Sequence, residues 1–150
     1  MPMDREALLR HYEEMRRDLI AAIEGIADEH LVAPTLDGWS VKDHLAHLAS
    51  WDEIRAAEVL RISAGHESAW RMNGEQDAVF NDLTHRLRGS LSLDQVRWET
   101  DSSHRRLLDA IADATPRGLD GSLYGEAGLL SRHEVQHTGW ITRWRTEQGL

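Results

Sequence analysis

The segment Leu129–Arg145, LLSRHEVQHTGWITRWR, decides the fold of this chain. His133 and His137 are four residues apart, so a helix places them one turn apart on the same face. The apolar residues at helical spacing on this face are Leu130, Trp140, Ile141 and Trp144. The segment therefore predicts an amphipathic helix that turns two imidazoles toward a core.

The histidine pair has two physical explanations. A buried imidazole must form hydrogen bonds or bind a metal, because an unpaired polar group in a core is costly. Two imidazoles one helical turn apart also form a bidentate site for zinc or another divalent ion that accepts nitrogen ligands. The spacing of His133 and His137 does not by itself decide between bonded core histidines and a metal site.

The same segment contains a literal H-E-x-x-H pattern, in which a peptidase uses two histidines to bind zinc and the glutamate as a general base. The metzincin form of this motif requires glycine at 140 and histidine at 143, where this chain has Trp140 and Arg143. We therefore disfavour a peptidase. Glu134 is expected either to form a capping box with Ser131 or to accept a proton beside a bound metal.

Helical periodicity and capping signals predict three further long helices. They span residues 4–28, 40–63 and 92–114. A shorter helix is expected at 75–88, with Val79, Leu83 and Leu87 on its apolar face. Residues 64–74 and 115–128 read as loops, and no segment alternates long enough to predict a strand. The sequence thus predicts one all-α domain, 1–150: a four-helix bundle with an additional short helix between the second and third long helices.

A second pair of histidines opens the second long helix, in the stretch WSVKDHLAHLASW at residues 39–51. His44 and His47 are three residues apart and share a face. One of them, together with His133 and His137, would supply three nitrogen donors and leave a coordination position open, as in catalytic zinc sites. The spacing alone does not choose between His44 and His47.

These two motifs resemble those of the DinB/YfiT-like superfamily of metal-binding four-helix bundles. The closest likeness is to the branch of ClbS/DfsB-like and mycothiol-dependent maleylpyruvate isomerase-type proteins. The matching residues are Gly38–Ala49 and the pair His133-x-x-x-His137, followed by Gly139 and Ile141. The resemblance extends over nearly the whole chain in the order of its helices.

The resemblance implies a metal site as well as a fold. It selects His47, within the L-x-H-L-A segment, as the ligand from the second helix, and His133 and His137 as the other two. It also implies a divalent metal, with zinc or nickel as the leading candidates, and a homodimer. Characterised relatives include thiol-dependent transferases and isomerases, and others act as hydrolases on small reactive molecules.

Composition narrows the partners that we expect. The net charge of −9, with no basic cluster, disfavours binding to nucleic acids and to anionic membranes. The chain has no cysteine, which removes disulfides and cysteine-ligated metal sites and fits a reducing cytoplasm. It also has no signal-like or membrane-spanning apolar run. We expect a cytoplasmic protein that acts on small molecules.

The leading hypothesis is a metalloenzyme that either transfers a low-molecular-weight thiol to a small electrophile or hydrolyses the electrophile. His47, His133 and His137 would bind the metal, and Glu134 or His104 would handle protons. His104 is otherwise a hydrogen-bonded core residue, and His85 a surface residue. The pocket walls are expected from the loops 64–74 and 115–128. The alternatives are a binding protein that sequesters a metal or a toxic compound without turnover, and a bundle whose histidines are structural.

Overall fold

The computed structural model describes residues 2–34, 36 and 38–150, and these form six α-helices. They are α1 (Arg5–Ile23), α2 (Asp28–Leu31), α3 (Val41–Ser63), α4 (Gly74–Arg88), α5 (Leu93–Ala112) and α6 (His133–Gln148). Two short 3₁₀ helices, η1 (Arg117–Leu119) and η2 (Gly121–Leu123), lie between α5 and α6. The described part of the chain contains no strand beyond an isolated bridge between Leu36 and Trp39. The predicted all-α class is confirmed.

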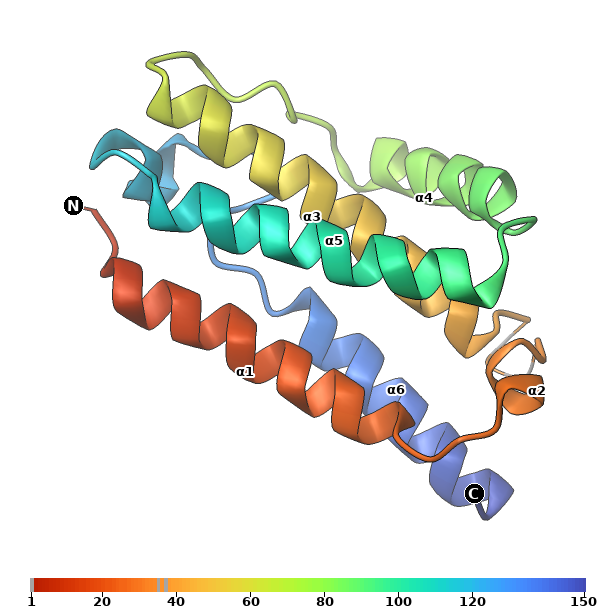
Figure 1. Ribbon diagram of the computed structural model, residues 1–150. Coiled ribbons are helices and arrows are strands. Elements are labelled where there is room, and N and C mark those ends of the chain that lie inside the picture. The colour runs from red at the N-terminus through yellow and green to blue at the C-terminus, as the bar shows by residue number, and fades with distance from the viewer. Residues whose placement is uncertain (1, 35, 37) are drawn as a thin grey trace.

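The four long helices form a bundle of two layers (Figure 1). Helices α1 and α6 pack side by side and run in the same direction, and α3 and α5 do the same in the opposite direction. The connection that contains α4 carries the chain back along α3, which allows α5 to start beside the beginning of α3. The predicted four-helix bundle with a short additional helix is therefore confirmed.

The first helix is shorter than its apolar pattern predicts. It ends at Ile23, because Glu24 adopts an extended backbone and Gly25 takes a positive φ of 79°. The chain then forms the separate one-turn helix α2, where the sequence predicts only the end of the first helix. This change of direction buries Ile26 and Leu31 in the core.

Helix α6 begins at His133, later than expected, and the capping box of Ser131 and Glu134 is not formed. The N-cap is Arg132, which makes no side-chain cap bond. The hydroxyl of Ser131 accepts from the backbone N–H of His133 at 3.2 Å, and Glu134 turns inward to Arg16 on α1. The predicted core stripe is also half correct. Ile141 and Trp144 are buried, whereas Leu130 and Trp140 are 52% and 46% exposed.

A layer of buried polar residues divides the apolar core into two clusters. One cluster includes Leu8, Tyr12, Met15, Val59, Leu107 and Ile111. The other includes Leu19, Val41, Leu45, Val96, Ile141 and Trp144. Between them lie Arg16, Asp52, Thr100 and Glu134, each 7% exposed or less. One polar side chain or more from every long helix thus meets at mid-height of the bundle.

Helix α4 has no buried residue, and its predicted apolar face is not a core face. Val79, Leu83 and Leu87 are 68%, 53% and 65% exposed. The helix instead packs through its other side, where the ring of Phe80 meets those of Trp51 and Trp70 edge to face.

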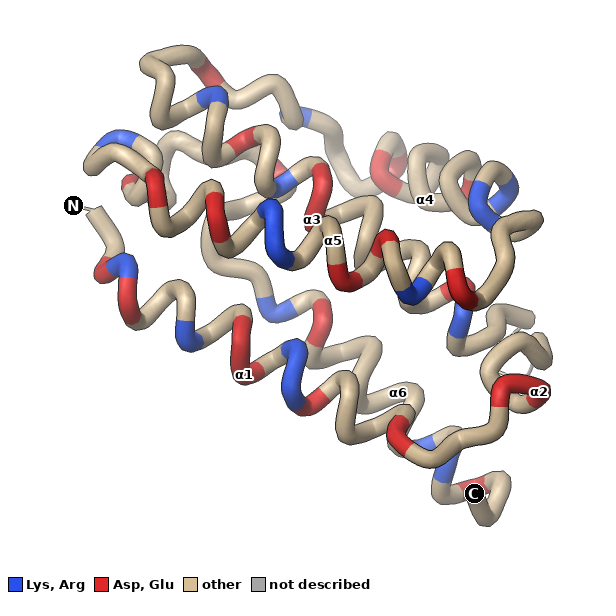
Figure 2. The backbone as a smooth tube through the Cα atoms, in the orientation of Figure 1, with Lys and Arg blue, Asp and Glu red and all other residues tan. Residues whose placement is uncertain are grey.

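Acidic and basic residues are interspersed along the helices (Figure 2). Among the described residues, no helix combines the length and the apolar character that crossing a bilayer requires.

Candidate metal centre

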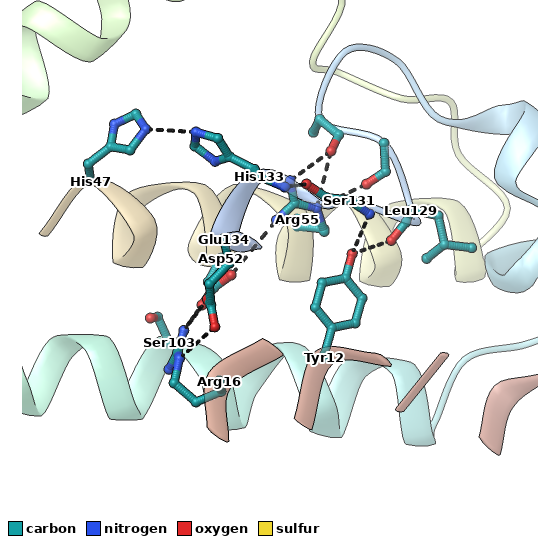
Figure 3. Close-up of polar contacts among 12 residues, drawn as sticks. Tyr12, Arg16, His47, Asp52, Arg55, Ser103, Leu129, Ser131, His133 and Glu134 are labelled. Carbon is teal, nitrogen blue, oxygen red and sulfur yellow. Dashed lines mark hydrogen bonds and ion pairs between the residues drawn. The ribbon is translucent and has the colours of Figure 1, made fainter. Parts of the chain in front are cut away.

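The antiparallel packing of α3 against α6 brings three predicted ligands together. His47 comes from α3, and His133 and His137 come from the first two turns of α6. The Nε2 atom of His133 lies 3.1 Å from Nε2 of His47 and 2.9 Å from Nε2 of His137. The three potential ligand atoms all lie within 4.8 Å of one another. Figure 3 shows the His47 and His133 rings facing each other.

The residues present fit a divalent cation. A ring nitrogen carries one hydrogen or presents one lone pair, so Nε2 of His133 can make one well-directed hydrogen bond, yet it contacts two nitrogens. A cation facing all three lone pairs satisfies them together. Tetrahedral zinc with roughly 2.0–2.1 Å bonds separates its nitrogen ligands by about 3.4 Å, a few tenths of an ångström more than the 2.9 and 3.1 Å observed.

The three imidazoles are neutral at pH 7. Burial lowers the pKa of His47 to about 3 and that of His133 to about 4. Burial and the neighbouring imidazoles lower the pKa of His137 to about 2. Metal binding requires the neutral ring, so none of the three rings has to lose its charge first, and the tautomer of each ring determines which nitrogen presents the lone pair.

His44 lies against His137, on the side away from the other two ligands. Its Nδ1 atom is 2.7 Å from Nδ1 of His137, and both rings are buried. If His137 donates from Nδ1, its Nε2 keeps a lone pair for a metal. If His44 donates instead, the hydrogen of neutral His137 sits on Nε2 and blocks that lone pair. The sequence spacing did not decide whether His44 or His47 joins the other two histidines. The structure places His47 in the triad and His44 behind His137.

Glu134, predicted as a cap or a proton acceptor, is held by Arg16 (Figure 3). Nε of Arg16 donates to Oε2 of Glu134 at 3.1 Å, and Nη2 donates to Oε1 at 2.9 Å. Nη2 also donates to Asp52 at 2.9 Å, and Nη1 donates to the carbonyl of Thr100 at 3.0 Å. Both oxygens of Glu134 thus accept hydrogen bonds from Arg16 of α1. Burial raises the pKa of Asp52 to about 6 despite the nearby guanidinium.

His104 occupies the same polar level of the bundle on α5. It is 8% exposed, and burial, together with the nearby charge of Arg16, lowers its pKa to about 4. Within the described residues it makes no hydrogen bond or ring contact to the three clustered imidazoles and is not part of their cluster. The structure thus brings together the predicted metal ligands but not the two predicted proton-handling residues.

A pocket of about 550 Å³ opens over the histidine cluster. Its lining residues are Leu36, Trp39, His44, His47, Ala78, Asn81, Asp82, His85, His133, His137 and Trp140. The expected walls, the loops 64–74 and 115–128, are not part of it, and they border a separate hollow instead. One wall of the pocket comes instead from α4, and the sequence of this helix does not show that it packs beside α3.

The sequence interpretation missed His85 and Asn81. His85 stacks on Trp39, with ring centroids 4.6 Å apart and an interplanar angle of 1°, and is not a plain surface residue. The signal was the spacing of Ala78, Asn81, Asp82 and His85, which recur every three or four positions and mark one face of α4.

Comparison with known proteins agrees with this architecture. Residues 11–141 match the DinB superfamily. Curated proteins give no match. Among solved structures, the chain is similar to an uncharacterised protein from Escherichia coli UTI89, with a TM-score of 0.80 and 15% identity over 100% of this chain and 97% of that one. That likeness concerns the fold alone, but the family match covers most of the sequence, so the chain belongs to the DinB superfamily.

Proposed function

We propose that this protein is a divalent-metal-dependent enzyme that either transfers a low-molecular-weight thiol to a small electrophile or hydrolyses the electrophile. The observation that carries the proposal is the convergence of three neutral imidazoles beside a pocket of about 550 Å³. Three protein ligands are typical of catalytic sites, whereas structural zinc sites use four. When bound, the cation supplies Lewis-acid activation of a water or thiol nucleophile at neutral pH.

The protein side chains have separate tasks in this proposal. His47, His133 and His137 hold the metal, with zinc or nickel as candidates. The indoles of Trp39 and Trp140 keep water from the site and shape the pocket. Glu134 anchors the first turn of α6 to α1 through Arg16. Proton transfer by this carboxylate would require it to leave the guanidinium.

The test is a product assay on protein loaded with zinc or with nickel. Mycothiol, bacillithiol, glutathione or buffer alone is incubated with chlorodinitrobenzene or monochlorobimane, and products are identified by mass spectrometry. We expect a thiol adduct or a hydrolysis product that depends on metal and disappears in His137→Ala. If the three thiols give no adduct, the transfer reaction is excluded, and if no product of either kind forms, the enzymatic proposal fails.

One observation favours a second candidate, a protein that sequesters a ligand without turnover. Among the described residues that line the pocket, the one carboxylate is Asp82, and it pairs with Arg86 at 3.0 Å on the exposed side of α4. Among the described lining residues, the pocket therefore offers no carboxylate general base that is free of an ion pair. Tight binding of an electrophile with no product would support this candidate.

A further inference from the structure

The pocket over the histidine cluster presents flat aromatic surfaces. The ring of Trp39 lies 5.3 Å from His44 and 5.5 Å from His47, measured between centroids, and its indole stacks on His85. The ring of Trp140 lies 4.8 Å from His137. An apolar planar molecule in this pocket would contact indole surface next to the histidines on both helices.

The charge of the pocket disfavours anionic ligands. None of the described lining residues is a lysine or an arginine. Asp82 carries the formal charge there, and its carboxylate is already paired with Arg86. A ligand with a carboxylate or phosphate on its body would have to move that charge out of water. No cationic side chain among the described lining residues would compensate the lost hydration, which is costly.

Asn81 provides a fixed amide hydrogen-bond donor in the wall that α4 contributes to the pocket. The indole Nε1 of Trp51 is 2.9 Å from Oδ1 of Asn81. Because an indole N–H can only donate, the amide atom that faces it must be the oxygen. The NH₂ group of Asn81 therefore points away from Trp51 and makes no hydrogen bond to any described residue, although the side chain lines the pocket.

The packing of Trp51 keeps this donor in place. Trp51 is 7% exposed and meets the rings of Trp70 and Phe80 edge to face, with centroids 5.6 Å apart in both cases. Its ring also lies 6.3 Å from that of His133. Trp51 thus connects the position of the amide to the wall beside the histidine cluster.

We propose that the pocket binds a small neutral molecule with a planar apolar body, and that a carbonyl or similar acceptor on this molecule accepts a hydrogen bond from the NH₂ group of Asn81. The proposal rests on the proposed function in taking the pocket as the substrate site. It does not depend on a bound metal, because indole and amide alone supply the recognition.

The test compares 4-fluoroacetophenone with 4-fluorobenzoate, which differ little in size but differ in charge. Binding to metal-free protein is measured by ¹⁹F NMR titration. We expect the ketone to bind at least about tenfold more tightly than the carboxylate. Equal affinities, or no detectable binding of the ketone at 10 mM, would overturn the proposal.

The variant Asn81→Asp isolates the donor. It keeps an oxygen for the indole of Trp51 and replaces the NH₂ group with a second oxygen, so the ketone should bind roughly three- to tenfold more weakly. The matched control is Asn73→Asp, which makes the same change outside the pocket lining and keeps an oxygen for the backbone N–H of Gln76, so it should leave ketone binding unchanged. An unchanged ketone affinity in Asn81→Asp would refute the role of Asn81. The ranking of the two probes in the wild-type protein needs no variant.

Metal analysis separates this test from that of the proposed function. If the protein binds no metal but ranks the two probes as expected, the metalloenzyme proposal falls and the pocket proposal stands. If the protein binds metal but does not favour the ketone, the pocket proposal falls and the metalloenzyme proposal stands.

Discussion

His44 and His137 face each other through their Nδ1 atoms, and this contact determines which nitrogen of His137 is available to a metal. A hydrogen-bonding partner on the outer nitrogen of a ligating histidine fixes its tautomer and the orientation of its ring. His44 is therefore the residue whose removal should weaken the site without removing a ligand.

We expect His44→Leu to lower metal affinity by roughly 10- to 100-fold, which is typical when such a partner of a ligand is lost. Competition with a chromophoric chelator measures this affinity. The matched control is His66→Leu at an exposed histidine outside the cluster. An affinity in His44→Leu equal to that of the control would show that the contact with His137 does not support the site.

His104 makes the stability of the protein depend on pH. Its pKa is about 4 in the folded state and near 6.5 in the unfolded chain, so the unfolded chain binds the proton first. Its contribution to stability is full above pH 6.5 and is lost as the pH falls toward 4. We expect His104→Gln to reduce the loss of unfolding free energy between pH 7.5 and pH 5 by about 1–2 kcal/mol. Urea denaturation of the metal-free protein at both pH values measures it, and equal losses in both proteins would contradict this assignment.

At the scale of the helices, Arg16 joins all four long elements of the bundle. From α1 it donates to Asp52 on α3, to the Thr100 carbonyl on α5 and to Glu134 on α6. The guanidinium thereby compensates two buried carboxylates at the level that separates the two apolar clusters. It also fixes the turn of α6 that carries His133.

We expect Arg16→Met to lower the free energy of unfolding by about 3–5 kcal/mol, because Glu134 loses its ion-pair partner in a buried site and Asp52 keeps only the more distant guanidinium of Arg55, at 3.8 Å. Replacing the three side chains together, with Arg16→Met, Asp52→Leu and Glu134→Leu, should recover much of this loss. Urea denaturation at pH 7.5 measures both effects. A single variant within about 0.5 kcal/mol of the wild type would mean that the ion pairs contribute little.

Helix α4 shows how far an apolar pattern can be read. Val79, Leu83 and Leu87 predicted the helix correctly, but this face is exposed, because Phe80 and Asn81 on the other side contact the bundle. Helical periodicity depends on the sequence alone, whereas the face that packs depends on the neighbouring helices.

We expect Leu83→Glu to change the free energy of unfolding by less than about 0.5 kcal/mol and Phe80→Ala to lower it by more, as measured in parallel urea titrations. The reverse order would contradict the observed packing.

At the scale of the whole molecule, the bundle and its order of helices could be predicted from spacing and capping signals. The start of α3 follows from the reciprocal bonds of Ser40 and Asp43. The third candidate metal ligand could not be chosen from spacing, because His44 and His47 share a face and the rotation of α3 against α6 decides which ring joins the triad. Likewise, the ion pair of Glu134 depends on a residue 118 positions away.

The triad also links the two layers of the bundle. His47 belongs to the layer of α3 and α5, and His133 and His137 belong to the layer of α1 and α6.

A ligand that binds only the folded state stabilises it, by about 2.7 kcal/mol at a hundredfold excess over its dissociation constant. We expect zinc or nickel to raise the thermal midpoint of the wild type but not that of His137→Ala. A rise of equal size in both proteins would place the bound metal elsewhere.

The most direct test of the metal centre is elemental analysis of untagged, purified protein after reloading with zinc or nickel. The structure predicts one divalent ion per chain in the wild type and in His66→Ala. It also predicts loss of that ion in each of His47→Ala, His133→Ala and His137→Ala, because each removes one of three converging nitrogens. A wild type that binds no metal after reloading, or triad variants that retain it fully, would contradict the account.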